Sequence, residues 1–288
     1  MAHGITGIDH ILVGVDNLDD AAQTWQRLGF TLTPRGRHLG WGTGNYCIMF
    51  PDEYIELLGI IDAGQFTNGL DRFLESQGEG GLGLSWGSKD AEASAASLAA
   101  SGTAMGEIRD LARQLELPEG TVLPRFKLAW FTDADTATPG LSSFITQHLT
   151  PTMIRKPGWL MHANGAIALK GVTIRHPDPM SLVEAYEKVF GMSAVNTTDS
   201  VMTVHVGRQR LIFAGTDDLE VLHPEIDFAD LGQDEGPRMV LATLASHDLD
   251  LTADHMAGFR VDYEEQRDGS VIVLPEAASG IALEFVKP

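Results

Sequence analysis

The chain has 288 residues, a length that fits about two globular domains. Its 40 acidic residues against 20 Lys and Arg give a net charge of −20. A field of this sign repels phosphate backbones and anionic lipids, so we expect neither nucleic acid nor a membrane as a partner. The single cysteine, Cys47, excludes an intrachain disulfide and a cysteine-based zinc or iron–sulfur site. The N-terminus has no signal-peptide pattern and no apolar run reaches ~18 residues, so we expect a cytoplasmic protein.

An internal repeat is the most informative feature. Without a gap, residues 6–30 align with residues 168–192, placing Asp16 on Asp178 and Gly29 on Gly191. Each copy predicts an apolar strand, then an amphipathic helix capped by the Asp at its start and ended by the Gly. Weaker copies cover residues 80–102 and 238–258.

Strand-like stretches follow each predicted helix, giving the order strand–helix–strand–strand–strand four times. They lie at 31–34, 45–50 and 54–60; at 107–111, 125–131 and 142–149; at 201–206 and 211–213, with a poorly defined final strand; and at 259–263, 271–274 and 281–286. The predicted fold class is α+β, with four βαβββ modules paired into two domains. We place the domains at 1–150 and 166–288, joined by a Pro- and Gly-containing linker at 151–165.

Several segments resemble the vicinal oxygen chelate (VOC) superfamily, which contains glyoxalases, bleomycin-resistance proteins and type I extradiol dioxygenases. The opening GIDHILVGVDNLDDAA, the helix end RLGF and the strand YIELLG are similar to its first module. The segments RHLGWGTGNYCIMF, FITQHLTP and WLMHANGA resemble a glyoxalase-like subgroup. The resemblance covers the whole chain. It implies that each pair of modules forms a cupped sheet, an open barrel, which can hold a metal ion on its first and last strands.

His10 and Glu56 are the predicted metal ligands of the N-terminal cup. His10 lies on the first strand, where the family usually places a ligand, and Glu56 lies in the middle of the apolar strand 54–60. A carboxylate there is costly to bury unless it is paired, protonated or bound to a metal. Leu84, at the position equivalent to His10 in the second module, cannot bind a metal. The third ligand is therefore Gln147 or His148, and we select His148 because imidazole binds divalent transition metals better than a carboxamide does.

The ligand set His10, Glu56 and His148 suits Fe(II), Mn(II), Ni(II) or Zn(II) and leaves coordination positions open. The second half shows no equivalent set, because Val172 and Ala242 occupy the positions of His10. We expect Glu284, on its last strand, and Glu220, near the equivalent strand of the third module, to take part in a structural hydrogen-bonded or ion-paired network.

The segment 40–45 leads into a strand rather than a helix, which favours a hairpin or a substrate-side loop over a dinucleotide loop. His38, Trp41, Thr43 and Asn45 are the candidate substrate-binding residues. For Trp130, packing is the favoured interpretation.

Two functions from different classes remain. The first is a metal-dependent enzyme, an isomerase, lyase or ring-cleaving dioxygenase, that acts on a small oxygen-chelating organic substrate with Glu56 as the catalytic base. The alternative is a metal-free protein of the bleomycin-resistance type that sequesters an aromatic or cationic small molecule. A third reading is an inactive structural module, and a homodimer is left open as a partner.

Overall fold

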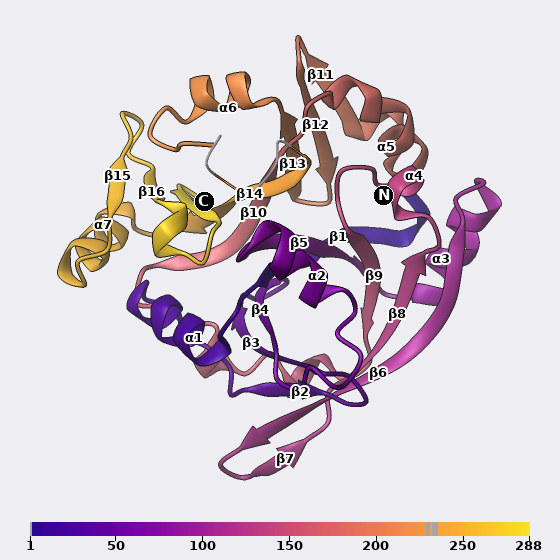
Figure 1. The fold of residues 1–288 in the computed structure, drawn as a ribbon, viewed down its shortest axis with the longest axis horizontal. Coiled ribbons are helices and arrows are strands. Elements are labelled where there is room, and N and C mark those ends of the chain that lie inside the picture. The colour runs from indigo at the N-terminus through magenta and orange to yellow at the C-terminus, as the bar shows by residue number, and fades with distance from the viewer. Residues whose placement is uncertain (1, 229–230, 232–235) are drawn as a thin grey trace.

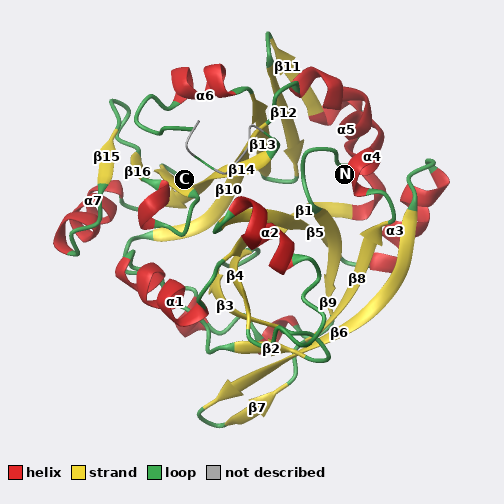
Figure 2. Cartoon of the chain, viewed as in Figure 1, coloured by secondary structure: helices red, strands yellow, loops and turns green. Residues whose placement is uncertain are grey.

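The computed structural model describes residues 2–228, 231 and 236–288, and it contains the four repeated modules (Figures 1 and 2). The first module consists of β1 (Ile5–Gly14), α1 (Leu18–Arg27), β2 (Gly36–His38), β3 (Thr43–Met49) and β4 (Tyr54–Ile60). The second consists of β5 (Gly80–Ser88), α3 (Ala91–Ala100), β6 (Met105–Leu117), β7 (Gly120–Val122), β8 (Arg125–Phe131), a short α4 (Ala134–Ala137) and β9 (Ser143–His148).

The second half repeats this order. The third module consists of β10 (Ala166–Arg175), α5 (Val183–Phe190), β11 (Val195–Thr198), β12 (Val201–Val206), β13 (Gln209–Ala214) and α6 (Thr216–Leu222). The fourth consists of β14 (Arg238–Ser246), α7 (Leu249–Gly258), β15 (Tyr263–Glu265), β16 (Val271–Val273) and β17 (Ala282–Val286). None of the helices in the described segments has both the length and the apolar character that a membrane crossing needs.

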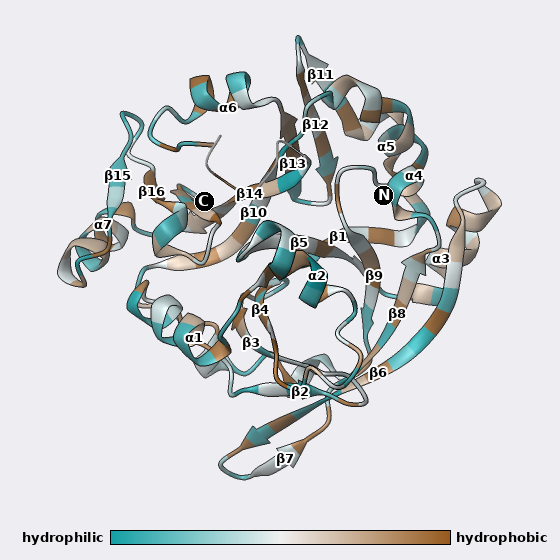
Figure 3. Ribbon diagram, in the orientation of Figure 1, coloured by the Kyte–Doolittle hydropathy of each residue, from teal (hydrophilic) through white to brown (hydrophobic). Residues whose placement is uncertain are grey.

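Each module has the same strand pairing, in which the first strand lies parallel to the last. β1 pairs with β4, β5 with β9, β10 with β13 and β14 with β17. Antiparallel pairing of β1 with β5 and of β10 with β14 then joins the modules two by two. The predicted α+β fold of four βαβββ modules is thus confirmed. β4, which carries Glu56, is otherwise mostly apolar and is largely brown in Figure 3, whereas β6 is partly teal.

Strand pairing closes the side of the N-terminal cup that an open barrel would leave uncovered. β2 pairs with β6 in antiparallel register, with Gly36 opposite Leu115 and His38 opposite Arg113. An additional helix, α2 (Leu70–Gln77), packs on β1, β4 and β5 beside the cup (Figure 1). The sequence had predicted neither α2 nor a strand as long as β6. The cup is therefore more enclosed than an open barrel.

Four local predictions are wrong. Of the predicted strand 259–263, only Tyr263 lies in a strand, β15. Residues 31–34 form no strand, and the short β2 takes that place. Helix α1 is capped by Asn17, whose side-chain oxygen accepts from the backbone N–H groups of Asp19 and Asp20, and not by Asp16. Glu220 lies in α6 rather than near a final strand, because β13 is the final strand of the third module.

The two halves meet along a seam where backbone touches backbone. Met239 on β14 pairs with Gly81 on β5. A Cβ atom on Gly207 would lie 2.3 Å from the carbonyl oxygen of Thr6, and one on Gly280 would lie 2.2 Å from that of Glu79. Only glycine permits such close approach of two main chains.

Glu53 also links the halves, since its Oε1 atom accepts from the backbone N–H of Leu169 at 2.8 Å. Its side chain is buried, and burial raises its pKa to about 7. A carboxyl group whose pKa is raised in the folded state stabilises the fold at low pH. That stability is lost as the pH rises through the window between the ordinary and the raised pKa.

We predict that Glu53→Gln flattens the pH dependence of stability between pH 4.5 and about 7. At pH 8 the variant should be more stable than the parent by on the order of 2 kcal/mol, because no buried carboxylate has to be ionised. Thermal unfolding across this range would test it, and unchanged pH dependence in the variant would contradict the role of Glu53.

The capping of α1 gives a second prediction. Asn17→Ala should cost about 1 kcal/mol of stability, or roughly 2 °C in melting temperature, because two N–H groups lose their acceptor. Asp16→Ala is the matched control and should have little effect, since the Asp16 side chain makes no hydrogen bond to a described residue, while its backbone N–H donates to Glu79. The reverse ranking in thermal denaturation would restore Asp16 as the cap.

Candidate active site

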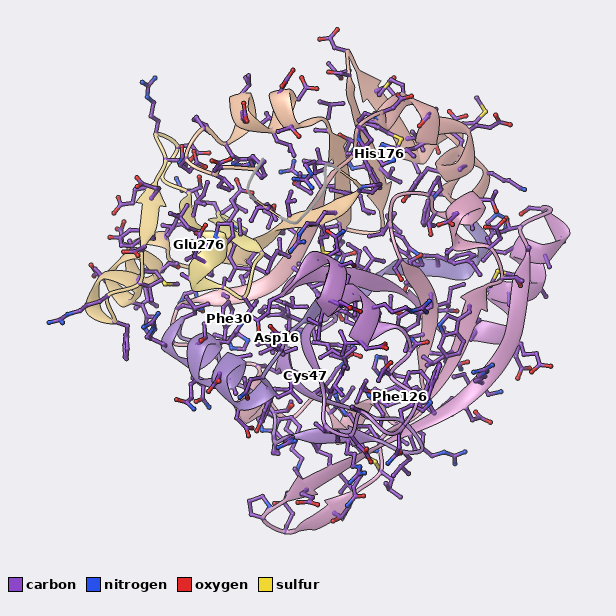
Figure 4. The ribbon with its side chains drawn as sticks, viewed as in Figure 1. Asp16, Phe30, Cys47, Phe126, His176 and Glu276 are labelled. Carbon is purple, nitrogen blue, oxygen red and sulfur yellow. The ribbon has the colours of Figure 1, made fainter. Side chains whose placement is uncertain are left out.

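A cavity of about 130 Å³ lies inside the closed N-terminal barrel, and its lining brings together most of the predicted site residues. Its walls are mostly aromatic and aliphatic side chains, and one side of it is formed by polar and charged side chains. The start of α2 completes the lining. Figure 4 marks Cys47 and Phe126, which pack in one hydrophobic cluster beside the cavity. The predicted residues found in the lining are His10, His38, Trp41, Thr43, Asn45 and Glu56.

A buried carboxylate orients His10. Asp9 lies next to it on β1, and its Oδ2 atom is 2.7 Å from His10 Nδ1 and 2.9 Å from His148 Nε2. Burial alone would raise the pKa of Asp9, but the charge of His148 and hydrogen bonds from both histidines hold it well below its usual range. An ionised carboxylate only accepts hydrogen bonds, so the Nδ1 atom of His10 must carry a proton. In neutral His10 the Nε2 lone pair is then free.

This free nitrogen faces Glu56. His10 Nε2 and Glu56 Oε2 are 3.5 Å apart, and neither atom makes a hydrogen bond to a described residue. Both side chains are buried, at 3% and 5% exposure. Burial would raise the pKa of Glu56, yet positive charge on His38 and His10 when they are protonated, the charge of Arg113 and a hydrogen bond from Asn45 lower it. The Oε2 atom of Glu56 is unpaired among the described residues.

His38 approaches the same carboxylate from β2. Its Nε2 atom is 3.6 Å from Glu56 Oε1 and 3.3 Å from Asn45 Nδ2, while its Nδ1 atom is 2.9 Å from Thr43 Oγ1. Asn45 Nδ2 also donates to Glu56 Oε1 at 2.5 Å. Since the amide nitrogen donates to His38, the Nε2 atom of His38 is an acceptor, which agrees with its pKa being lowered by burial.

Arg113 was missed by the sequence reasoning, although it lines the cavity and is only 3% exposed. Its Nη1 atom donates to Asn45 Oδ1 at 3.3 Å and contacts Cys47 Sγ at 2.8 Å. Gly36 makes room for it, because a Cβ there would lie 2.6 Å from Arg113 Cδ. A signal existed in the sequence. Arg113 sits in an apolar face of β6 in the same way that Glu56 sits in β4.

His148 lies outside the cavity lining. It shares a face of β9 with Phe144 and Thr146, which do line the cavity, but its Nε2 atom contacts Asp9 and not Glu56. Gln147 points to the other face, where it accepts from the backbone N–H of Ala91. The structure therefore brings His10 and Glu56 together and places His148 behind His10. Trp130, expected only to pack, is part of the lining.

The donor set was tested for its fit to a metal ion. Two bonds of about 2.1 Å at a tetrahedral ion place donor atoms about 3.4 Å apart. The 3.5 Å between His10 Nε2 and Glu56 Oε2 matches that spacing. Across the described residues, however, no three His, Cys, Asp or Glu side chains already stand in an arrangement that could hold a metal. Two ligands therefore fit, and a third would require a local shift.

In the second half, the equivalent positions hold no histidine. Val172 and Ala242 are paired with each other across β10 and β14. Thr243 Oγ1 donates to Glu284 Oε2 at 2.8 Å, which confirms the expected hydrogen bond of that carboxylate.

The comparisons with known proteins agree with this fold. The model of a glyoxalase-like domain matches residues 8–190. The chain belongs to the glyoxalase-like domain family. A comparison with curated protein sequences gave no match.

Solved structures of the VOC fold are similar at low identity. A hypothetical protein from Staphylococcus aureus has a TM-score of 0.65 and 13% identity, over 98% of this chain and 99% of that one. A mutant 4-hydroxymandelate synthase from Streptomyces coelicolor has a TM-score of 0.58 and 12% identity, over 98% and 92%. A xylose isomerase-like TIM barrel/4-hydroxyphenylpyruvate dioxygenase fusion has a TM-score of 0.54 and 12% identity, over 100% of this chain and 49% of that one. These similarities show the fold.

The contact of Asp9 with His10 gives a prediction for the imidazole. In its neutral form, His10 should carry its proton on Nδ1, because the Asp9 carboxylate can only accept. Nitrogen-15 NMR of the histidine side chains, assigned with His10→Ala, would measure this tautomer. Asp9→Asn should shift it toward a mixture, whereas an Nε2–H tautomer in the parent protein would contradict the arrangement.

Proposed function

We propose that the chain is a divalent-metal-dependent, glyoxalase-like enzyme that acts on a small oxygenated organic substrate in the N-terminal cavity. The observation that carries the proposal is the pair His10 Nε2 and Glu56 Oε2, which are buried, 3.5 Å apart and without a hydrogen bond to any described residue. The second support is the Asp9 carboxylate, because histidines that bind metals usually donate their other ring N–H to such a group.

His38 replaces His148 in the proposed ligand set. Its Nε2 atom is an acceptor that already lies 3.6 Å from Glu56, whereas His148 is engaged with Asp9. Metal binding by His38 would have to displace the amide of Asn45 from His38 Nε2. The set His10, His38 and Glu56 has the two imidazoles and one carboxylate that suit Fe, Mn, Ni or Zn.

The residues of the cavity can perform proton transfer. A bound divalent ion would supply Lewis-acid stabilisation of negative charge on substrate oxygens. Glu56 is the proposed base, because its Oε2 atom makes no hydrogen bond to a described residue and its pKa is lowered. To accept a proton through that atom it would have to give up its place in the ligand set. The aromatic and leucine walls exclude water from the reacting atoms. Asp9 keeps His10 in one orientation throughout.

A metal-free binding protein is the second candidate. The hydrogen bond from Asn45 to Glu56 favours it, because that bond satisfies one carboxylate oxygen without any ion. In this reading the cavity would hold a small molecule without converting it, and the acidic residues of the site would have only binding roles.

Metal content distinguishes the two candidates. Protein purified without a metal-affinity tag should contain close to one divalent ion per chain or take one up in calorimetric titration with Zn, Mn, Ni or Fe(II). His10→Ala should abolish this binding because a ligand with no substitute is lost. His38→Ala should weaken it by about tenfold or more.

His148→Gln is the matched control, and it should bind metal nearly as tightly as the parent. Metal lost from His148→Gln but retained by His38→Ala would restore His148 as the third ligand. A parent protein that binds none of the four ions would favour the binding-protein candidate.

A further inference from the structure

We propose that Arg113 is the anion-binding group of the cavity and that the natural ligand is a small organic carboxylate with an apolar, ring-sized body. This names the substrate class of the proposed function and relies on it for the location of the site. The contact with the anion itself does not require a metal ion. Four features of the described residues support it.

The first feature is the charge. A guanidinium is costly to bury without a counter-charge. Among the described residues no carboxylate lies within 4.0 Å of Arg113, whereas eight other pairs of basic and acidic groups are that close. Glu56 acts on Arg113 only from beyond this distance. Its contacts are neutral groups, the amide of Asn45 and the thiol of Cys47, whose pKa burial raises to about 11.

The second feature is the set of unused donors. Arginine has five N–H groups, and the contacts of Arg113 with the described residues come from Nη1 alone. Its Nε atom is buried without a partner, and Nη2 makes no hydrogen bond to a described residue. The edge formed by Nε and Nη2 is one that binds a carboxylate through two parallel hydrogen bonds.

The third feature is position. Arg113 lies opposite His38 in the pairing of β2 with β6, so the strand contact that closes the barrel also brings the cation to the cavity. A ligand paired with Arg113 would therefore share the cavity with Glu56 and His10.

The fourth feature is the shape of the remaining space. The cavity of about 130 Å³ is comparable to the roughly 150 Å³ of an apolar cavity that holds benzene. Its walls include Trp41, Phe126, Trp130 and Phe144. This surface suits an aromatic or branched apolar group and gives no partner to a second charge on the body of the ligand. The buried guanidinium of Arg113 argues against a cationic ligand, which the negative net charge of the chain had favoured.

Calorimetric titration with benzoate and with benzamide, its neutral analogue of the same shape, tests the inference. Both titrations are done in the presence of a chelator. Benzoate should bind at least about tenfold more tightly than benzamide, because only the anion pairs with the guanidinium. Arg113→Met should remove this preference while leaving benzamide binding in place, and Arg113→Lys should recover only part of it.

Arg125→Met is the control, because it removes the same charge at an exposed position on β8. It should leave the benzoate preference unchanged. If Arg113→Met does not fold, the ratio of the benzoate affinity to the benzamide affinity, compared between the parent protein and Arg113→Lys, decides the test. Equal binding of the probes, no benzoate binding, or a preference that survives in the Arg113 variants would overturn the inference.

The result is separable from the metal test. A benzoate preference that depends on Arg113 in chelator stands even if the protein binds no metal. Benzoate binding that requires added metal and ignores Arg113 would support the proposed function and reject the anion site.

Discussion

The buried carboxylate of Asp9 is the constraint on which the candidate site depends. It lies between two imidazoles, and a buried anion is stable only when hydrogen bonds and nearby charge replace its lost hydration. His10 and His148 provide that replacement. The same contacts fix the proton of His10 on Nδ1 and leave Nε2 for the cavity. They also explain why His148 serves as a partner of Asp9 and not of Glu56.

Closure of the barrel has a comparable influence on the other side of the cavity. Three residues of β2 are enough to pair with β6, and this pairing sets His38 opposite Arg113. Asn45 then connects the cation to the carboxylate by accepting from Arg113 and donating to Glu56. Arg113, Asn45, Glu56 and His38 therefore form one hydrogen-bonded network in which each group orients the next. An exchange of any member affects the others.

The sequence predicted the parts of this arrangement that follow from periodicity. The alternation in Tyr54–Ile60 located β4 and placed Glu56 on the correct face, and the same parity separated Gln147 from His148. The alternation of side chains predicts which face of a strand a residue lies on, but not how far along the strand the cavity extends. His148 lies on the same face as Thr146, which is the last residue of β9 in the cavity lining. β2 is too short to show a period, and Arg113 depends on its pairing with that strand. The pairing is a consequence of tertiary contact, so the local pattern could mark Arg113 as unusual but could not place it in the cavity.

The glycine seam between the halves limits how far the repeat can be treated as a set of exchangeable parts. Each half has its own paired modules, which suggests that halves from related proteins could be recombined. At Gly207 and Gly280, however, the main chain of the opposite half occupies the space that a side chain would need. A carbonyl oxygen of the backbone cannot move aside as a flexible side chain can. A chimaera would therefore fit together only if the incoming half also carried glycine at these contacts, so the two halves must change together in evolution although their folds are separate.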